Sequence, residues 1–353
     1  MTHSTNESSQ PEPASQPETT STKPAAATEH VSVMPDEIVH WVGEIQPRTI
    51  IDGTYGGGGH TRLLLNVLAT DPLGATSSAS TPAGSGEAVT PAEAADSNAQ
   101  RLAPLIIGMD RDPGVIARDD QPGGPGSDPR IELFTGSYEK SPAALAHCDR
   151  THADALVLDL GLSSDQLADR ERGFSFTIAD APLDLRFDPE SDIPAYQWLA
   201  FNEEKDIADA IYQYGEERYS RRIARQICLR SKQRDPVRTV GDLVDICRRC
   251  VPRSKNHDIH PATRTFQALR IAVNDELGIL ERTLASAPDW IAPGGRIAAI
   301  SFHSLEDRIV KNAFRDDERW EVLTRKPLRP TDAELQYNTR SRSAKLRVAQ
   351  RLP

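Results

Sequence analysis

Short hydrophobic runs, each ending in a polar residue, recur along the first half of the chain. The run that ends at Asp159 is almost wholly apolar, as is typical of a parallel strand covered on both faces of a sheet. Shorter runs end at Asp52 and Asp110. We predict strands at residues 49–52, 105–110, 131–135 and 155–159.

Helical periodicity lies between these runs and dominates the middle of the chain. We predict helices at residues 34–42, 61–68, 203–214, 219–231 and 264–277. The strand rhythm stops from residue 165 to residue 258 and returns with a strand at 293–301, which begins in a glycine turn. The predicted fold class is therefore α/β, a Rossmann-like fold with an inserted, mostly helical domain.

Two segments contain almost no large apolar side chains. Residues 1–29 and 71–100 are rich in small and polar residues, and they cannot bury enough apolar surface to offset the entropy lost on ordering. We predict a disordered tail and a low-complexity loop there. The α/β domain then comprises residues 30–164 and 259–353, and the helical insertion comprises residues 165–258.

The formal net charge of -11 argues at first against a nucleic-acid partner, since phosphate binding needs positive charge. Lys and Arg nevertheless cluster at residues 218–238 and in a basic C-terminal segment at residues 325–351, while acids crowd the tail and the linkers. Each cluster is compatible with a phosphate-binding patch or with a solvated helix face whose charges are paired. The sequence leaves both open.

Cysteine content and hydropathy bear on other classes of protein. Four cysteines do not suggest a disulfide framework, and the single C-x-x-C at Cys247 and Cys250 has no second pair of ligands at zinc-finger spacing, so no metal site is predicted. No run approaches the roughly 20 apolar residues of a membrane span, and residues 1–29 resemble neither a secretory signal nor a transit peptide. We expect a cytoplasmic protein without membrane contact.

Four consecutive glycines, Gly56 to Gly59, follow the first predicted strand and precede a helix. Glycine reaches backbone angles that other residues avoid, and it lets a ligand approach the main chain closely. Ligands of open α/β sheets bind beyond the carboxyl ends of the strands. Four such ends carry Asp52, Asp110, Tyr138 and Asp159. One Asp alone is often only a helix cap, but the four together with the glycines predict a cofactor site.

The glycine loop lacks both the spacing of a dinucleotide-binding G-x-G-x-x-G motif and the Lys of a Walker A loop. A pyrophosphate ligand is therefore not required. Once the 71–100 loop is left out, Asp110 stands close to the position from which an acidic residue reaches a ribose. A cofactor with an adenosine, a charged amino-acid end and no phosphate fits this pattern, and S-adenosylmethionine is such a molecule.

Eight motifs in one order carry a family resemblance. They begin at Asp52, Gly108, Leu158, Glu171, Pro182, Tyr214, His260 and Ile300. Together they closely resemble the bacterial ribosomal RNA small subunit methyltransferase H family, also called MraW, from His30 to about Arg351, with residues 71–100 as the chief interruption. The resemblance implies a methyltransferase domain that uses S-adenosylmethionine to methylate the exocyclic N4 of a cytosine in 16S rRNA of the small ribosomal subunit, near the decoding centre.

By position within the matching motifs, the resemblance implies cofactor contacts at Gly58, Gly59, His60, Asp110, Tyr138, Asp159 and Gln166. The position of Tyr138 is commonly Phe in the family, and either residue supplies a ring for the adenine. The cytosine amine is a poor nucleophile because its lone pair is delocalised into the ring. Acceptor oxygens would localise that pair, so we predict Asp159 as a catalytic carboxylate, with nearby main-chain carbonyls as the alternative.

The substrate-binding residues are open between two interpretations. Asp184, a second catalytic candidate, and Arg186 could read a flipped base or form an internal salt bridge. His303 could face the pocket or be a hydrogen-bonded core histidine. The candidate phosphate contacts are Arg264, Arg340 and Arg342.

Other functions are compatible with the residues when the resemblance is set aside. The same fold could methylate a protein side chain or a small amine, because glycines and strand-end carboxylates do not name the acceptor. A nucleotide-responsive RNA-binding protein without catalysis is a second alternative, and a dehydrogenase is a distant third because the dinucleotide spacing is absent. The sequence does not indicate an oligomeric state.

Overall fold

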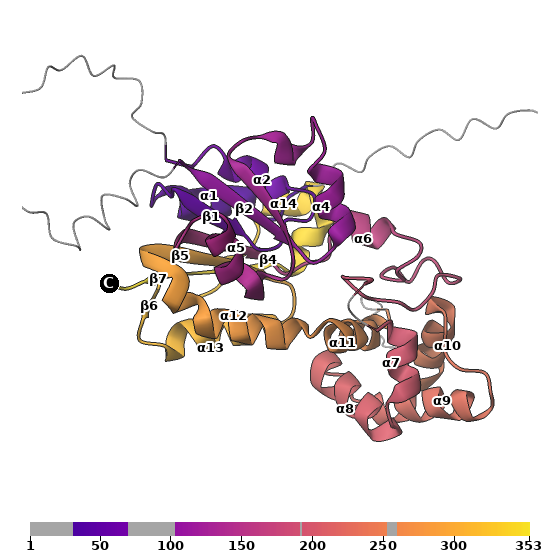
Figure 1. Ribbon diagram of the computed structural model, residues 1–353. Helices are drawn as coiled ribbons and strands as arrows, with labels where there is room; N and C mark the ends of the chain where they lie inside the picture. The colour runs from indigo at the N-terminus through magenta and orange to yellow at the C-terminus, as the bar shows by residue number, and fades with distance from the viewer. Residues whose placement is uncertain (1–30, 70–102, 191–192, 253–259) are drawn as a thin grey trace, which may run out of the picture.

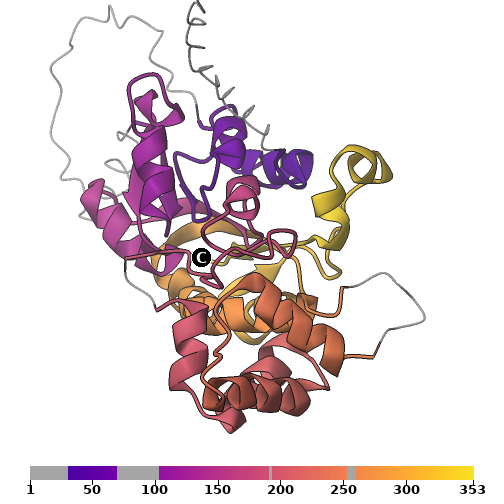
Figure 2. The ribbon, with the colours of Figure 1, turned by 90° about the vertical axis from the view of Figure 1, so that its right-hand side faces the viewer.

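The computed structural model describes residues 31–69, 103–190, 193–252 and 260–353 (Figure 1). Their strands form one seven-stranded sheet in the order β3-β2-β1-β4-β5-β7-β6. The helices of residues 195–250 form a separate lobe beside the sheet, as Figures 1 and 2 show from two directions. The tail at 1–29 and the loop at 71–100 that the sequence predicts lie outside the described residues.

Five parallel strands make up most of the sheet. They are β1 (Thr49–Asp52), β2 (Leu105–Asp110), β3 (Ile131–Thr135), β4 (Ala153–Asp159) and β5 (Ile291–Ser301). All five were predicted, the last two beginning two residues earlier than expected. The strand order reverses at β1, which pairs with β2 on one side and β4 on the other, so the α/β, Rossmann-like fold class is confirmed.

Two further strands, β6 (Trp320–Val322) and β7 (Lys345–Arg351), add an antiparallel edge that the sequence analysis missed. It described β7 only as part of a basic C-terminal segment. Two cations of β7 are in fact neutralised: Arg347 Nε donates to Asp307 Oδ1 at 2.7 Å, and Lys345 Nζ donates to Asp307 Oδ2 at 3.0 Å. This part of the segment is sheet rather than an open basic patch.

Helices cover both faces of the sheet. One face packs against α5 (Ser141–His147), α12 (Glu276–Trp290) and α13 (Ser304–Asp316) through residues such as Leu145, Leu280 and Phe314. The other face packs against α1 (Pro35–Gly43) and α2 (Gly59–Leu64). The shorter elements are α4 (Pro113–Asp119), α6 (Ser164–Ala168), α14 (Asp332–Tyr337) and the 3-10 turns η1 (Pro125–Ser127), η2 (Tyr138–Lys140) and η3 (Thr339–Ser343).

The helical lobe has its own hydrophobic core. It consists of α7 (Ala195–Phe201), α8 (Glu204–Gly215), α9 (Ser220–Lys232) and α10 (Val240–Cys250), packed against α11 (Thr263–Asn274). Gly215 lets α8 approach α11 closely, because a Cβ there would lie 2.4 Å from the carbonyl oxygen of Arg264. Since α11 contributes Phe266 and Leu269 to this core, the helical core extends past residue 258.

The α11–α12 junction fixes the helical lobe to the sheet. Asn274 is 1% exposed, and its side chain donates to Leu185 O at 2.7 Å and accepts from Phe187 N at 2.8 Å. Arg111, which follows β2, donates to Asn274 O at 2.6 Å. Asp275 has a positive φ of 49°, so the chain breaks there and α12 starts in a new direction. The junction therefore joins the sheet, the 185–187 segment and the helical lobe.

The Asp307 cluster predicts an acid-sensitive contribution to stability. Burial raises the pKa of the Asp307 carboxyl, but hydrogen bonds from Arg347 and Lys345 outweigh burial and hold this pKa below its ordinary value. We expect Asp307→Asn to lower the free energy of unfolding by about 2 kcal/mol at pH 7. The difference should disappear as the pH falls through the lowered pKa of the folded state, since Asp307 is then protonated in both states.

Chemical denaturation at pH 7 and at pH 3 measures this difference. Asp316→Asn is the matched control, because Asp316 pairs with Arg315 on the exposed surface and its loss should have no measurable effect. An equal loss of stability for Asp307→Asn at both pH values would contradict the prediction.

Candidate cofactor pocket

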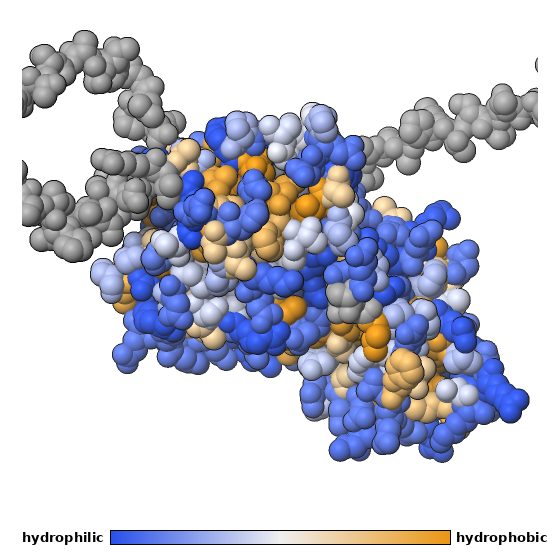
Figure 3. All heavy atoms as spheres, viewed as in Figure 1, coloured by the Kyte–Doolittle hydropathy of each residue, from blue (hydrophilic) through white to orange (hydrophobic). Residues whose placement is uncertain are grey.

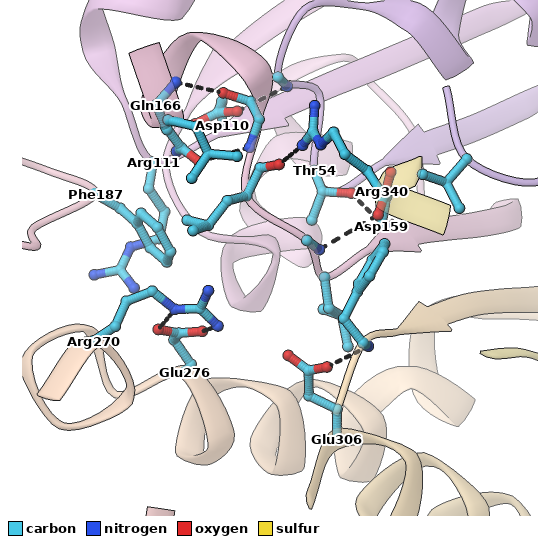
Figure 4. Close-up of a pocket in the computed structure, with 18 of the residues that line it drawn as sticks. Thr54, Asp110, Arg111, Asp159, Gln166, Phe187, Arg270, Glu276, Glu306 and Arg340 are labelled. Atoms are coloured by element: carbon cyan, nitrogen blue, oxygen red, sulfur yellow. Dashed lines mark hydrogen bonds and ion pairs between the residues drawn. The ribbon is translucent and has the colours of Figure 1, made fainter. Parts of the chain in front are cut away.

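A cavity of about 420 Å³ lies beyond the carboxyl ends of β1, β2, β4 and β5. Its walls come from the sheet and from the C-terminal segment through Arg340 (Figure 4). On the side of the helical lobe, Phe266 of α11 lines it. Its volume is in the range of small-molecule sites. The cavity therefore occupies the position at which open α/β sheets bind their ligands.

The glycine loop forms one side of this cavity in a conformation that requires glycine. Gly56 and Gly58 have φ values of 53° and 67°, in the left-handed region. A Cβ at Gly58 would also lie 2.7 Å from the Tyr55 hydroxyl. Two hydrogen bonds from backbone N–H groups hold the loop against β2, since Tyr55 N donates to Met109 O at 2.9 Å and Gly56 N donates to the Asp110 side chain at Oδ2, at 2.8 Å.

Asp110 is a partly buried carboxylate at the end of β2. Burial raises the pKa of Asp110 to about 6, although hydrogen bonds from the backbone N–H groups of Asp112 and Gly56 act in the opposite direction. Each carboxylate oxygen accepts one of these bonds and has a second lone pair. Asp110 can therefore accept hydrogen bonds from a ligand in the cavity.

Asp159 and His60 face each other at the ends of β4 and the glycine loop. His60 Nε2 lies 2.9 Å from Val33 O, and because a carbonyl only accepts, Nε2 carries a hydrogen. In the neutral ring Nδ1 is then an acceptor, and it lies 3.8 Å from Asp159 Oδ2. Asp159 N donates to Thr54 Oγ1 at 2.6 Å, which ties the end of β4 to the loop after β1 (Figure 4). A ligand that donates hydrogen bonds would satisfy both acceptors.

The cavity wall also contains two acidic groups with partners, the partly buried Glu276 and the buried Glu306. Arg270 and Glu276, on either side of the α11–α12 break, form a bidentate pair at 2.8 and 2.9 Å (Figure 4). Glu306 in the first turn of α13 accepts from Phe302 N at 2.8 Å, and its other carboxylate oxygen lies 3.0 Å from His303 Nε2. These pairs fix the side chains that border Tyr138 and the end of β5.

Arg340 of η3 reaches the cavity from the far end of the chain. Its guanidinium donates to Leu162 O in the loop after β4, and Figure 4 shows it beside Asp159. Burial lowers the pKa of Arg340, while the charge of Asp159 acts in the opposite direction. The structure thus places Arg340 in the cavity wall, next to the strand end that carries Asp159.

The segment at residues 31–34 is held over the cavity by α14 and the turn after it. Glu334, 4% exposed, accepts from Met34 N at 2.9 Å, and Asn338 Nδ2 donates to Ser32 O at 3.3 Å. Val33 lines the cavity and also supplies the carbonyl that holds His60. Glu334 therefore supports the position of His60 indirectly: it holds Met34 N, and the neighbouring Val33 O holds the His60 ring.

Comparison with known proteins identifies the family. The model of the MraW methylase family matches residues 97–352. The chain belongs to the MraW methylase family. This confirms the resemblance carried by the eight motifs.

Relatives named ribosomal RNA small subunit methyltransferase H align along almost the whole chain. The protein of Rhodopirellula baltica is 68% identical over 93% of this chain and 93% of its own. Those of Synechococcus elongatus and Deinococcus deserti are 45% and 40% identical, over 92% and 95% of this chain and 95% and 97% of theirs. A solved rRNA methylase from Streptococcus thermophilus aligns over 90% of this chain and 97% of its own at 11% identity, with a TM-score of only 0.38.

Most residues predicted for this MraW family member meet in the one cavity. Those that line it are Gly59, His60, Asp110, Tyr138, Asp159, Gln166, His303 and Arg340. Gly58 is the residue before α2 and lies behind the lining residues, packed against Tyr55. Within the described part of the chain, no group of three or more His, Cys, Asp or Glu side chains is arranged to hold a metal ion, and no helix is long and apolar enough to cross a membrane.

Four predicted substrate residues of the MraW sequence do not line the cavity. Asp184 and Arg186 form the internal ion pair that was one of the two interpretations, with Arg186 Nη2 2.7 Å from Asp184 Oδ2. Arg264 is exposed and donates to Glu216 O at 3.2 Å, and Arg342 is exposed. Their roles toward substrate stay predictions.

Sequence reasoning missed several residues in the cavity wall and behind it. Glu306 lines the cavity and forms a capping box with the predicted His303 at the start of α13, a pattern readable as a polar residue followed three positions later by Glu. No comparable signal marks Arg270 with Glu276, or Glu334 with Met34, because these pairs depend on a helix break and on contact between the two ends of the chain.

Removing the buried acceptor at position 334 should loosen residues 31–34. Glu334→Ala leaves the Met34 N–H without its partner, and an unsatisfied buried donor costs about 1 to 3 kcal/mol. We expect faster amide hydrogen exchange at Met34 and a lower melting temperature. Glu334→Gln is the matched control, because its amide oxygen can accept the same bond. Equal exchange rates in the Ala and Gln variants would contradict this role.

Proposed function

We propose that this protein transfers a methyl group from S-adenosylmethionine to the exocyclic N4 of a cytosine in 16S rRNA of the small ribosomal subunit, near the decoding centre. The observation that carries the proposal is the convergence of Asp110 and Asp159, from the ends of β2 and β4, on one cavity in a chain of the MraW methylase family. The relatives' names supply the class of RNA.

The residues present in the cavity are compatible with S-adenosylmethionine. Asp110 is an acceptor for the two ribose hydroxyls, and Tyr138 supplies a ring beside an adenine. Asp52 is buried next to the glycine loop, where burial raises its pKa, and it adds to the acidic character around Asp159. A cofactor with a sulfonium and an ammonium group would offset this accumulation of carboxylates.

The facing acceptors of His60 and Asp159 suit the ammonium group of the amino-acid end. An ammonium has three donors, and a position between Nδ1 and Oδ2 would use two of them. The cofactor would then be oriented by Asp110 at the ribose and by His60 with Asp159 at the amino acid. Bound in this way, S-adenosylmethionine supplies an activated methyl group for in-line displacement by the acceptor nitrogen.

The contribution of the protein to the transfer is alignment and polarisation. Asp159 Oδ2 points toward His60, whereas Oδ1 lies on the side of the loop after β4, 3.4 Å from Gly161 N. We assign Oδ1 as the acceptor for an N–H of the cytosine amine, which would localise the nitrogen lone pair toward the methyl group. Arg340 holds this loop through Leu162 O, so the acceptor base and Asp159 keep one geometry.

Methyl transfer to small ribosomal subunits from cells lacking this enzyme tests the proposal. We expect label from S-adenosylmethionine to appear in N4-methylated cytidine of the 16S rRNA. Asp159→Asn should reduce turnover about 100-fold, the loss typical of a single polar group that stabilises a transition state. Asp165→Asn, an exposed change in α6, should leave turnover unchanged.

The outcomes separate the alternatives. Label in a ribosomal protein would favour a different acceptor, and cofactor binding without any transfer would favour a non-catalytic RNA-binding protein. Full turnover by Asp159→Asn would show that Asp159 is not a catalytic residue. The proposed reaction, methyl transfer to a cytosine of 16S rRNA, would still stand.

Binding of the adenosine moiety should depend on pH through Asp110. Because ribose hydroxyls donate to the ionised carboxylate, affinity should be full above the pKa of about 6 and should fall as the pH drops through it. Between pH 7 and pH 5 the ionised fraction falls about tenfold, and the affinity for adenosine should fall with it. Calorimetry with adenosine, which lacks the amino-acid end, excludes effects at His60. Asp110→Asn should bind adenosine weakly at both pH values, and an unchanged pH dependence in this variant would contradict the assignment.

A further inference from the structure

Three rings lead outward from the cavity along the helical lobe. Phe266 and Phe176 both line the cavity and meet edge to face, with centroids 5.0 Å apart. Phe176 in turn stacks on His260, with centroids 5.2 Å apart and an interplanar angle of 18°. His260 does not line the cavity and is half-buried, so this stack passes from the cavity wall to the surface.

Positive charge begins where the rings end. The end of α10 packs in the same core as the rings, since Cys247 and Cys250 belong with Phe266 to one hydrophobic cluster against which Phe176 packs. Burial lowers the pKa of His260, and the charge of Arg248 acts in the same direction. Arg222 Nη2 donates to Arg249 O at 3.2 Å, so α9 and the end of α10 meet at this point. Arg221, Arg222 and Arg225 lie close together on one side of α9, at i, i+3 and i, i+4 spacings, and Arg218 lies in the turn just before this helix. We call these four residues, with Arg248 and Arg249, the arginine face; all six are exposed.

The arginine face differs from the other end of the same helices. At the far end of α9, Arg230 forms ion pairs with both Asp235 and Asp242. Within the part of the chain that the structure describes, no residue of the arginine face forms an ion pair. Asp245, one turn before Arg248 on α10, is exposed and makes none either. Paired charges, the alternative left open by the sequence, therefore account for one end of residues 218–238 and not for the other. On the side drawn in Figure 3, the outer end of the helical lobe is predominantly hydrophilic.

We propose that the RNA strand next to the target cytosine leaves the cavity across the Phe176 and His260 rings, with one flanking base against His260 and its phosphates on the arginine face. This inference rests on the proposed function and adds the path of the substrate. Bases stack on aromatic and imidazole rings with little dependence on sequence, and arginine binds phosphate through charge and paired donors. A single strand that presents an extruded base needs both kinds of contact at the mouth of the pocket.

The arginine face is tested by the salt dependence of RNA binding. Arg248→Gln/Arg249→Gln in the full-length protein is compared with Lys311→Gln/Arg315→Gln, two exposed cations one turn apart on α13, outside both basic clusters. The probe is a fluorescent single-stranded 16S rRNA fragment containing the target cytosine. Loss of two phosphate contacts should reduce the slope of log K against log salt by about 1.4, at about 0.7 per contact with a single strand. The control pair should keep the wild-type slope.

The stacking role is tested by rescue with another ring. His260→Ala should raise KM for the RNA several-fold, and His260→Phe should restore it, whereas a merely structural hydrogen-bonding role of the imidazole would not be rescued by Phe. The affinity for S-adenosylmethionine should stay at the wild-type value in all these variants, which shows that the cavity is intact.

The two proposals fail in distinguishable ways. If the wild-type protein methylates the RNA while Arg248→Gln/Arg249→Gln keeps the full salt slope, the arginine face does not bind the phosphates and the proposed function stands. If the slope falls as expected but the wild-type protein transfers no methyl group to RNA, the proposed function is wrong and the binding surface stands. If Phe fails to rescue position 260, the stacking of a flanking base is overturned.

Discussion

The reversal of strand order at β1 is the constraint on which the rest of the site depends. Because β1 is hydrogen-bonded to β2 on one side and β4 on the other, the chains that leave β1 and β4 must separate and open a crevice between them. Two bonds hold its floor, from Gly53 N to Val157 O at 2.9 Å and from Asp159 N to Thr54 Oγ1 at 2.6 Å. The distance between the carboxylates that face the cavity is thus set by the spacing of strands.

Placing several carboxylates at this crevice raises the free energy of the folded state, and local hydrogen bonds offset part of that increase. Asp52 accepts from Thr61 Oγ1 at 2.7 Å, and Asp110 accepts from two backbone N–H groups. The left-handed glycine at position 56 allows one of these N–H groups to turn toward Asp110. The pKa of Asp110 is nevertheless raised, so the partners offset burial only in part. Such an incompletely compensated acidic site is suited to a cationic ligand.

Features that depend on residues close together in the sequence were predictable, and features that depend on residues far apart in the sequence were not. The parallel strands, the glycine loop and the strand-end residues Asp110 and Asp159 follow from local patterns, and they were predicted at the right positions. Strand β7 was missed because its Lys and Arg residues conceal a strand, and two of its charges are neutralised by Asp307, about 40 positions away. The roles of Glu334 and Arg340 depend on contacts between opposite ends of the chain, which no local pattern contains.

The helical lobe is held in one orientation by polar contacts that tolerate little displacement. Asn274 bonds at once to both sides of the 185–187 segment, and Arg111 reaches it from the end of β2. Rotation of the lobe would leave several of these buried groups without partners, at a cost of about 1 to 3 kcal/mol each. Apolar packing alone would allow gradual sliding, whereas these directional bonds do not. The rings on the lobe and the carboxylates on the sheet therefore form one preorganised cavity, which is the property that an alignment-limited reaction requires.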